Sequence, residues 1–175
     1  KYKLPAKWRC DTRADSINED IVIRMKDAGC GQMSIGIESA DEATLSVIGK
    51  NETTDDFKRA AGILNKHGIQ WKAYMIIGFP SDTEEGILGS IDFIKKLKPF
   101  RITLSYFTPY KGTELYDEAR TLGLINDTYD MSLFSHQSPH NYFCPLIPHE
   151  RYLRLREEVS KDIDEYNKGA LKIWK

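Results

Sequence analysis

The sequence is short of cysteine, of excess charge and of long apolar runs. Its three cysteines, Cys10, Cys30 and Cys144, have the spacing of neither a disulfide framework nor a zinc site. The net charge of −1 gives no sign of a surface built to bind nucleic acid. No apolar run approaches the roughly 20 residues that span a bilayer, and no apolar signal segment opens the chain. These absences indicate a cytoplasmic protein of the ordinary soluble class.

The chain is long enough for one sizeable core, since 41% of its 175 residues are hydrophobic. Apolar segments alternate with amphipathic ones, an order that predicts a mainly parallel sheet with helical crossovers. Strands are predicted at 6–11, 32–38, 69–78 and 101–106, and helices at 16–28, 41–48, 53–67, 83–97, 113–122 and 148–174. Four strands are too few to close a barrel, which usually needs about eight. We therefore predict the α/β class, as an open sheet or part of a barrel.

Local patterns also predict how some of these elements begin and pack. Residues 16–19 and 81–84 have the spacing of a capping box, so a helix should begin at each. The near-continuous hydrophobicity of residues 69–78 is typical of a strand buried on both faces. Spacings of three and four residues place two sets of side chains on inward helix faces: Ile17, Ile21, Met25 and Ala28 in the first helix, and Phe57, Ala60, Ala61 and Leu64 in the third.

Polar side chains follow the predicted strands at their carboxyl ends, which meet at one rim of a parallel sheet. Glu38 is the most informative, because a carboxylate directly after an apolar strand is poorly solvated unless it has a partner or a ligand. A structural role stays open for it, as the neighbour of a helix cap or in an ion pair with Arg13 or Lys50. The mixture of side chains suits a polar, partly cationic small molecule. The rim set is Asp11, Thr12, Arg13, Glu38, Ser39, Gly78, Phe79, Pro80, Tyr106, Thr108 and Tyr110.

Other candidate sites are weaker. His136 and His140 are four residues apart, but Pro139 between them argues against the helix that would bring both imidazoles to one metal. Cys144 has no basic neighbour in the sequence and is interpreted as a structural thiol. The glycines match neither a phosphate-binding loop nor a dinucleotide fingerprint. The sequence therefore predicts no metal bound by residues of this chain.

Five motifs occur in a fixed order along the chain: residues 8–15 (WRCDTRAD), residues 28–30 with 35–39 (AGC and IGIES), residues 48–50 (IGK), residues 75–84 (MIIGFPSDTE) and residues 106–116 (YFTPYKGTELY). Together they resemble the second half of the radical S-adenosylmethionine (SAM) catalytic domain. The resemblance is to the group that holds oxygen-independent coproporphyrinogen oxidase, the methylthiotransferases and cobalamin-domain enzymes such as the anaerobic magnesium-protoporphyrin ester cyclase. It covers about residues 6–120.

The resemblance implies a fold and a function. The fold is a partial TIM-like (βα)6 barrel. Residues 1–123 would supply its last four βα units, followed at 124–175 by a covering loop and an amphipathic helix. The function is that of an iron–sulfur oxidoreductase that reductively cleaves SAM to a 5′-deoxyadenosyl radical, which takes hydrogen from a substrate. The implied cofactors are SAM and a [4Fe–4S] cluster on a CxxxCxxC loop, with cobalamin in a further domain of some members.

The resemblance also implies cofactor-binding residues, each of which stands at the position of a functional residue in the family's motifs. Glu38 stands where a Glu or Gln contacts the ribose or methionine part of SAM, and Lys50 stands where a basic residue faces the methionine carboxylate. Gly78 and Pro80 would wall the adenosine pocket. Three more residues complete the set: Arg13 from the preceding strand, Tyr74, which stands where some members have an acidic ribose ligand, and Tyr106 at the rim.

This chain departs from the family in its cysteines, which cannot form CxxxCxxC. We therefore expect a fragment of a longer enzyme, inactive in isolation and with no catalytic residues of its own. Its first strand would leave an unpaired edge for another chain or a second copy. Two alternatives stay open: a non-catalytic binding or assembly module that kept the half-barrel without the cluster, and, less well supported, a sugar-phosphate enzyme of the TIM-barrel type. The sequence does not distinguish a small-molecule substrate from a macromolecular one.

Overall fold

The structure, a computed structural model, describes residues 6–173, with side chains as far as residue 170. Its four strands form one parallel sheet in the order β1-β2-β3-β4, and the sheet does not close into a barrel. The elements are β1 (Trp8–Thr12), α1 (Glu19–Asp27), β2 (Cys30–Glu38), α2 (Glu42–Val47), α3 (Thr54–Lys66), β3 (Gln70–Ile77), α4 (Glu84–Lys96), β4 (Arg101–Tyr106), α5 (Glu114–Thr121), the 3-10 turn η1 (Met131–Leu133) and α6 (His149–Ile173). The predicted order and the α/β class are confirmed. Trp174, which ends the predicted last helix, lies outside the described residues.

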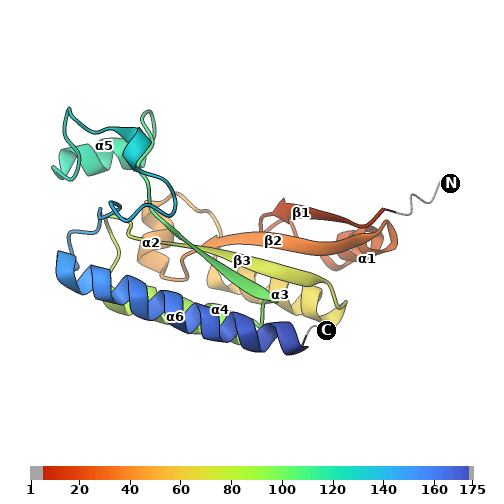
Figure 1. The fold of residues 1–175 in the computed structure, drawn as a ribbon. Coiled ribbons are helices and arrows are strands. Elements are labelled where there is room, and N and C mark those ends of the chain that lie inside the picture. The colour runs from red at the N-terminus through yellow and green to blue at the C-terminus, as the bar shows by residue number, and fades with distance from the viewer. Residues whose placement is uncertain (1–5, 174–175) are drawn as a thin grey trace.

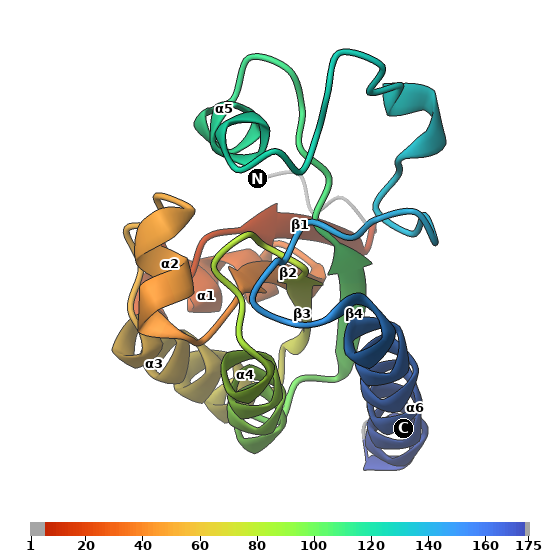
Figure 2. The same ribbon diagram turned by 90° about the vertical axis from the view of Figure 1, so that its left-hand side faces the viewer.

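The long helices cover one face of the sheet. Helices α1, α3, α4 and α6 lie on the same side of the strands (Figure 2). Helix α5 and the segment that follows it project beyond the carboxyl ends of the strands, where β4 leads into them (Figure 1). Parallel α/β folds bind their ligands at this end. The fold therefore places α5 and residues 124–147 beside any site at the rim.

The sheet is amphipathic across its strands. The helix-facing side chains are apolar and fully buried, and they include Met33, Ile35, Trp71, Ala73, Met75 and Ile102. The opposite face, called the open face below, carries two polar rows in strand register: Asp11, Ser34, Lys72 and Arg101, and then Gly36, Tyr74 and Thr103. A sheet packed between two layers of helices would be apolar on both faces. The open face is therefore suited to contact polar groups.

Strand β3 shows that the prediction of burial on both faces was wrong. Its residues alternate between fully buried and half-buried along the whole strand. The reason is that helices cover only one side, while Lys72 and Tyr74 stand on the open face. The alternation is hard to see in the sequence because two open-face residues, Tyr74 and Ile76, are themselves aromatic or apolar.

Helix α1 begins later than its capping-box spacing predicted. Asn18 caps the helix in place of Ser16, and its side chain accepts a hydrogen bond from the Ile21 amide at 2.9 Å. Ile17 therefore precedes the helix, and its spacing to Ile21 does not define a helix face. The buried residue of α1 is Val22, whereas Ile21 is 44% exposed.

Helix α3 agrees with its prediction, and α4 does so in part. The four residues predicted to face inward from α3 are all buried: Phe57, Ala60, Ala61 and Leu64. In α4 the cap is Thr83, which accepts a hydrogen bond from the Gly86 amide at 3.0 Å, so the predicted range of 83–97 begins at the right residue, whereas the capping-box assignment to Ser81 was wrong. Asp82 does not take part in that cap because its carboxylate points back to the preceding turn.

The outer edge of β4 is covered by side-chain amides. The carboxamide of Asn167 on α6 accepts a hydrogen bond from the Ile102 amide at 2.8 Å and donates one to the Ile102 carbonyl at 2.9 Å. A residue of a neighbouring strand would make the same pair of bonds. Farther along, Gln137 donates to the carbonyl of Leu104 at 2.7 Å. At the other side of the sheet, β1 pairs only with β2 among the described strands.

A second apolar cluster lies over the rim. Its buried members are Phe79, Phe107, Tyr116, Ala119, Ile125 and Phe143. The rings of Phe79 and Phe107 are 5.0 Å apart between centroids, so the cluster joins the turn after β3 to the end of β4. Asn141 ties the later segment to β4 by donating to the Phe107 carbonyl at 2.8 Å. Within residues 6–173, none of the helices combines the length and the apolar character needed to cross a membrane.

Candidate functional site

Strand β2 ends in a strained turn at Glu38. The backbone φ of Glu38 is 65°, and the Ser39 amide donates a hydrogen bond to the Ile37 carbonyl at 2.8 Å. A positive φ enclosed by a bond between residues two apart is a γ-turn, which is strained for a residue with a side chain. The pairing of β2 with β3 also shifts register between Gly36 and Glu38. Such strain persists only where the surroundings fix it, and it is concentrated at binding and active sites.

The turn directs the Glu38 carboxylate back over Gly36. A methyl group on Gly36 would overlap Oε1 of Glu38 and lie 3.7 Å from Nζ of Lys50. A carboxylate and an ammonium group therefore converge above this glycine. Burial raises the pKa of Glu38, the charge of Lys50 lowers it, and the carboxylate of Glu52 raises it further. The pKa of Glu38 would therefore change with any charge that a bound ligand brings close to it.

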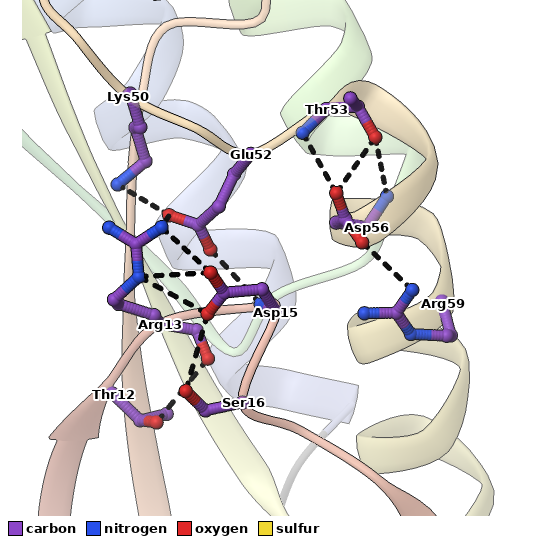
Figure 3. A network of polar contacts seen from close by, with 9 residues as sticks. All are labelled: Thr12, Arg13, Asp15, Ser16, Lys50, Glu52, Thr53, Asp56 and Arg59. Atoms are coloured by element: carbon purple, nitrogen blue, oxygen red, sulfur yellow. Dashed lines mark hydrogen bonds and ion pairs between the residues drawn. The ribbon is translucent and has the colours of Figure 1, made fainter.

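Glu52 is the centre of a charged network that the sequence analysis did not identify (Figure 3). Its side chain is 0% exposed, and its Oε2 lies 3.0 Å from Nζ of Lys50 and 3.5 Å from a guanidinium nitrogen of Arg13. Its Oε1 accepts a hydrogen bond from the Asp15 amide at 3.1 Å. Arg13 also pairs with the Asp15 carboxylate at 2.7 Å. The two cations considered as ion-pair partners for Glu38 thus pair with Glu52.

Tyr74 stands beside this group on the open face. In strand register it is flanked by Gly36 on β2 and by Thr103 on β4, and it is half-buried. Glu38 and Lys50 converge over Gly36, so Tyr74 stands on the neighbouring strand beside the residue that they cover. The structure therefore brings together four of the predicted residues: Arg13, Glu38, Lys50 and Tyr74.

Gly78 and Pro80 form the turn between β3 and α4, at the same end of the sheet. Gly78 has a φ of 96°, and a methyl group there would overlap the hydroxyl of Tyr152. Glycine is therefore required both by the backbone conformation and by the packing. Pro80 is buried. The turn is held by Asp82, whose carboxylate accepts hydrogen bonds from the amides of Gly78 at 2.7 Å and Phe79 at 3.1 Å.

Tyr106 lies apart from the other predicted residues. The guanidinium carbon of Arg156 is 3.7 Å from the centroid of its ring, and its hydroxyl is 3.4 Å from Oγ of Ser160. Both partners are on α6, so the side chain points to the helix-covered face. Tyr74 points to the open face, and Tyr106 is therefore outside the group around Gly36.

The cysteines have the surroundings of structural thiols. Burial, and then the neighbouring Cys30, raise the pKa of Cys10 to about 11. Burial raises the pKa of Cys144 to about 12. Thiols with such pKa values are poor metal ligands and poor nucleophiles. In the part of the chain that the structure describes, no group of three or more His, Cys, Asp or Glu side chains could hold a metal ion.

The group around Gly36 has the chemistry of a binding site. The ammonium of Lys50 can pair with a ligand carboxylate, and the carboxylate of Glu38 can accept hydrogen bonds from ammonium or hydroxyl groups. The hydroxyls of Tyr74 and Thr103 can both donate and accept. This set suits a ligand that combines a carboxylate, an ammonium group and hydroxyls.

Comparison with known proteins points to one family. The model of the radical SAM superfamily matches residues 5–94. An uncharacterized methyltransferase of Pyrococcus horikoshii is 35% identical over 122 residues, which are 70% of this chain and 27% of that protein. The anaerobic magnesium-protoporphyrin IX monomethyl ester cyclase of Rubrivivax gelatinosus is 26% identical over 141 residues, which are 79% of this chain and 25% of that protein. The chain thus spans about a quarter of the length of these relatives.

A solved structure has a similar fold. It is that of TsrM, a radical SAM methyltransferase of Kitasatospora setae, with cobalamin and a [4Fe–4S] cluster bound. The TM-score is 0.64 at 18% sequence identity, and the match covers 85% of this chain and 36% of TsrM. At that identity the likeness concerns the fold alone. It agrees with the expectation of part of a TIM-like barrel.

Proposed function

Because the chain belongs to the radical SAM superfamily, we propose that it supplies four βα units and one side of the SAM pocket to a longer enzyme. The observation that carries the proposal is the convergence of Glu38 and Lys50 over Gly36, next to a polar sheet face. A strained turn at Glu38 is hard to explain by packing alone, since its carboxylate is held over the open face rather than in the apolar core.

The residues around Gly36 fit SAM by chemical class. The methionine part of SAM carries a carboxylate and an ammonium group, which match Lys50 and Glu38 respectively. Its ribose carries hydroxyls, which match the carboxylate of Glu38 or the hydroxyl of Tyr74. Arg13 acts on this group through Glu52, and the turn of Gly78 and Pro80 would bound the adenine side. Tyr106 has no place in this pocket because it faces α6.

The described residues do not fit the iron–sulfur cluster. Cys10, which is half-buried, and Cys144, which is buried, are thiols with raised pKa values, and the described side chains form no metal-binding group. We therefore assign the cluster ligands to another part of a longer protein. With cluster and SAM bound, the family's chemistry is the reductive cleavage of SAM to a 5′-deoxyadenosyl radical. The part assigned to this chain is to bind and orient SAM. Cobalamin in a further domain is proposed on the sequence resemblance alone.

The family and the relatives support a SAM-dependent enzyme, and the names of two relatives describe methyl transfer and ring formation. The rival proposal is a binding or assembly module that uses the same half-barrel without a cluster. It differs from the enzyme in requiring neither SAM nor reductant.

Anaerobic reconstitution of the full-length protein with iron and sulfide tests the proposal. We expect the reconstituted protein to bind SAM and to form 5′-deoxyadenosine when a reductant is added. Lys50→Ala should raise the dissociation constant for SAM at least tenfold, because a charge-assisted hydrogen bond contributes about 1.5–3 kcal/mol. Lys58→Ala is the matched control, since the Lys58 side chain is 57% exposed and pairs with Asp55 at the surface. A protein that assembles no cluster and neither binds nor cleaves SAM would contradict the proposal and favour the binding module.

A further inference from the structure

Two basic side chains stand side by side on the open face of the sheet. Lys72 on β3 and Arg101 on β4 are register partners on neighbouring strands, which lie about 4.8 Å apart. Lys72 is half-buried and Arg101 is exposed. Like charges at such neighbouring positions repel each other and destabilise a sheet. An anion bound between the two side chains would remove this cost.

The described part of the chain does not supply that anion. Among the side chains that the structure describes, neither Lys72 nor Arg101 forms an ion pair. The carboxylate in the same row, Asp11, is separated from Lys72 by strand β2, where Ser34 stands between them. Asp164 on α6 borders the same groove along β4 as Arg101 without pairing with it. Helices α1, α3, α4 and α6 lie on the other side of the sheet (Figure 2).

The charges on the open face are divided along the strands. Around Gly36, near the carboxyl ends, the carboxylate of Glu38 converges with the ammonium of Lys50. Lys72 and Arg101 stand one row farther from those ends, where no such carboxylate joins them. A strand rises about 3.3 Å per residue, so the two rows are about 7 Å apart. The candidate SAM pocket and the basic pair are therefore separated by the length of a small molecule.

The row next to the basic pair leaves room for such a molecule. Gly36 has no side chain, and Thr103 has a short one. Tyr74 stands between them in strand register and is half-buried. The hydroxyls of Tyr74 and Thr103 can both donate and accept hydrogen bonds. A polar ligand lying along the strands would therefore find partners over its whole length.

We propose that Lys72 and Arg101 form an anion-binding subsite for the substrate, which is then an organic molecule that carries a carboxylate or a phosphate. The inference rests on the proposed function and adds the substrate class to it. The guanidinium of Arg101 can bind two oxygens of the anion at once, and the ammonium of Lys72 adds a further charged contact. The anion would be held about 7 Å from the row of Gly36, so the neighbouring carbons of the substrate would extend toward SAM.

The test measures how fast an acetylating reagent modifies Lys72 in the reconstituted full-length protein. Succinate and inorganic phosphate are the probes for the two kinds of anion, and sodium chloride keeps the ionic strength constant. We expect at least one probe to slow the acetylation of Lys72 by about fivefold or more, as read by mass spectrometry. Lys58 is the internal control, since its side chain is 57% exposed and pairs with Asp55. Its rate should change less than about twofold.

Arg101→Gln should raise the probe concentration needed for half-maximal protection about tenfold, because a charge-assisted hydrogen bond is lost. Arg101→Lys keeps the charge and should restore most of the protection. Arg59→Gln is the matched control, since Arg59 is 50% exposed and pairs with Asp56, and it should leave the protection unchanged. The melting temperature of Arg101→Gln should equal or exceed that of the unaltered protein, because a repulsive contact is removed.

The two proposals fail in different ways. Unaltered protein that does not bind SAM in an isothermal titration overturns the proposed function, and the assignment of the anion to a substrate falls with it. Protein that binds SAM, but whose Lys72 is acetylated equally fast with and without the probes, overturns the anion subsite alone.

Three further results would also overturn the subsite. If Lys72 cannot be acetylated in the full-length protein, another part of that protein covers it. If Arg101→Gln lowers the melting temperature, a carboxylate of the longer protein already pairs with Arg101. If SAM alone protects Lys72, the basic pair belongs to the SAM pocket and not to a substrate.

Discussion

The carboxylate of Glu38 lies over Gly36, two residues earlier in the same strand, and any side chain on Gly36 would overlap it. The strained turn at Glu38 is what bends the chain so that this contact occurs. The absence of a side chain at residue 36 is therefore part of the candidate site, because it leaves room for a carboxylate and an ammonium group above the sheet.

Gly36→Ala should weaken SAM binding about tenfold with little change in stability. The added methyl group displaces the flexible end of the Glu38 side chain, and a lost charge-assisted hydrogen bond accounts for that factor. Isothermal titration of the reconstituted full-length protein with SAM measures the effect. Gly31→Ala is the control, because it lies in the same strand and an added methyl group would meet nothing within 4 Å. Equal affinities in the two variants would mean that Glu38 does not contact SAM.

Glu52→Gln should lower the free energy of unfolding by about 2 kcal/mol, since it leaves Lys50 and Arg13 without a buried counter-charge. Denaturant unfolding of the full-length protein at pH 7 measures the loss. Asp55→Asn is the surface control, because Asp55 is 86% exposed in its pair with Lys58 and should change stability by less than about 0.5 kcal/mol. A Glu52→Gln variant as stable as this control would show that the network is not an energetic unit.

Asp82 should make the protein less stable as the pH rises from about 4 to about 6. Its pKa is 3.8 ordinarily and about 6 in the folded chain, so in this range the folded state holds a proton that the unfolded state has released. Stability falls with pH wherever the folded state binds more protons. The difference corresponds to up to about 3 kcal/mol, at 1.36 kcal/mol for each pKa unit.

Unfolding of Asp82→Asn and the unaltered protein between pH 4 and 7 isolates this contribution, because all other carboxylates are common to both. The stability of the variant relative to the unaltered protein should increase across the range. A constant difference would show that Asp82 titrates near its ordinary pKa.

Asn167→Ala should expose the edge of β4. It removes both hydrogen bonds to the backbone of Ile102, so we expect a loss of about 1–3 kcal/mol and a new tendency to associate through the uncovered strand. Unfolding and sedimentation at several protein concentrations measure the two effects. Lys168→Ala, an exposed neighbour on α6, should show neither effect. Monomeric behaviour of Asn167→Ala at all concentrations would contradict the role assigned to Asn167 in covering the edge.

The sequence predicts those features that depend on local spacing. Strand β4 has the bounds that were predicted, and α3 buries the four residues that its periodicity selected: Phe57, Ala60, Ala61 and Leu64. Glu38 could be singled out because a carboxylate after an apolar strand is unusual wherever the strand lies. The start of α1 was predicted two residues early, and the capping box of α4 was assigned to Ser81 although Thr83 is the cap, because several polar residues compete to cap each helix and packing decides between them.

Glu52 and Asp82 could not be found in this way. Glu52 accepts a hydrogen bond from the backbone amide of Asp15, which lies 37 residues earlier in the chain. No local sequence pattern therefore links Glu52 to Asp15. Asp82 does have local partners, but Ser81–Glu84 also has the spacing of a helix cap, and that interpretation assigns it no role. Two side chains that interact electrostatically with Asp82, Tyr152 and Cys144, come from far along the chain.

The covered edge of β4 gives the sheet a direction in which it can be continued. Asn167 and Gln137 occupy backbone groups that an incoming strand would need, so β4 acts as a terminus of the hydrogen-bonded ladder. Within residues 6–173, β1 is the strand whose outer edge pairs with no other strand. In the longer enzyme proposed above, further strands would therefore join the sheet at β1, on the side away from α6.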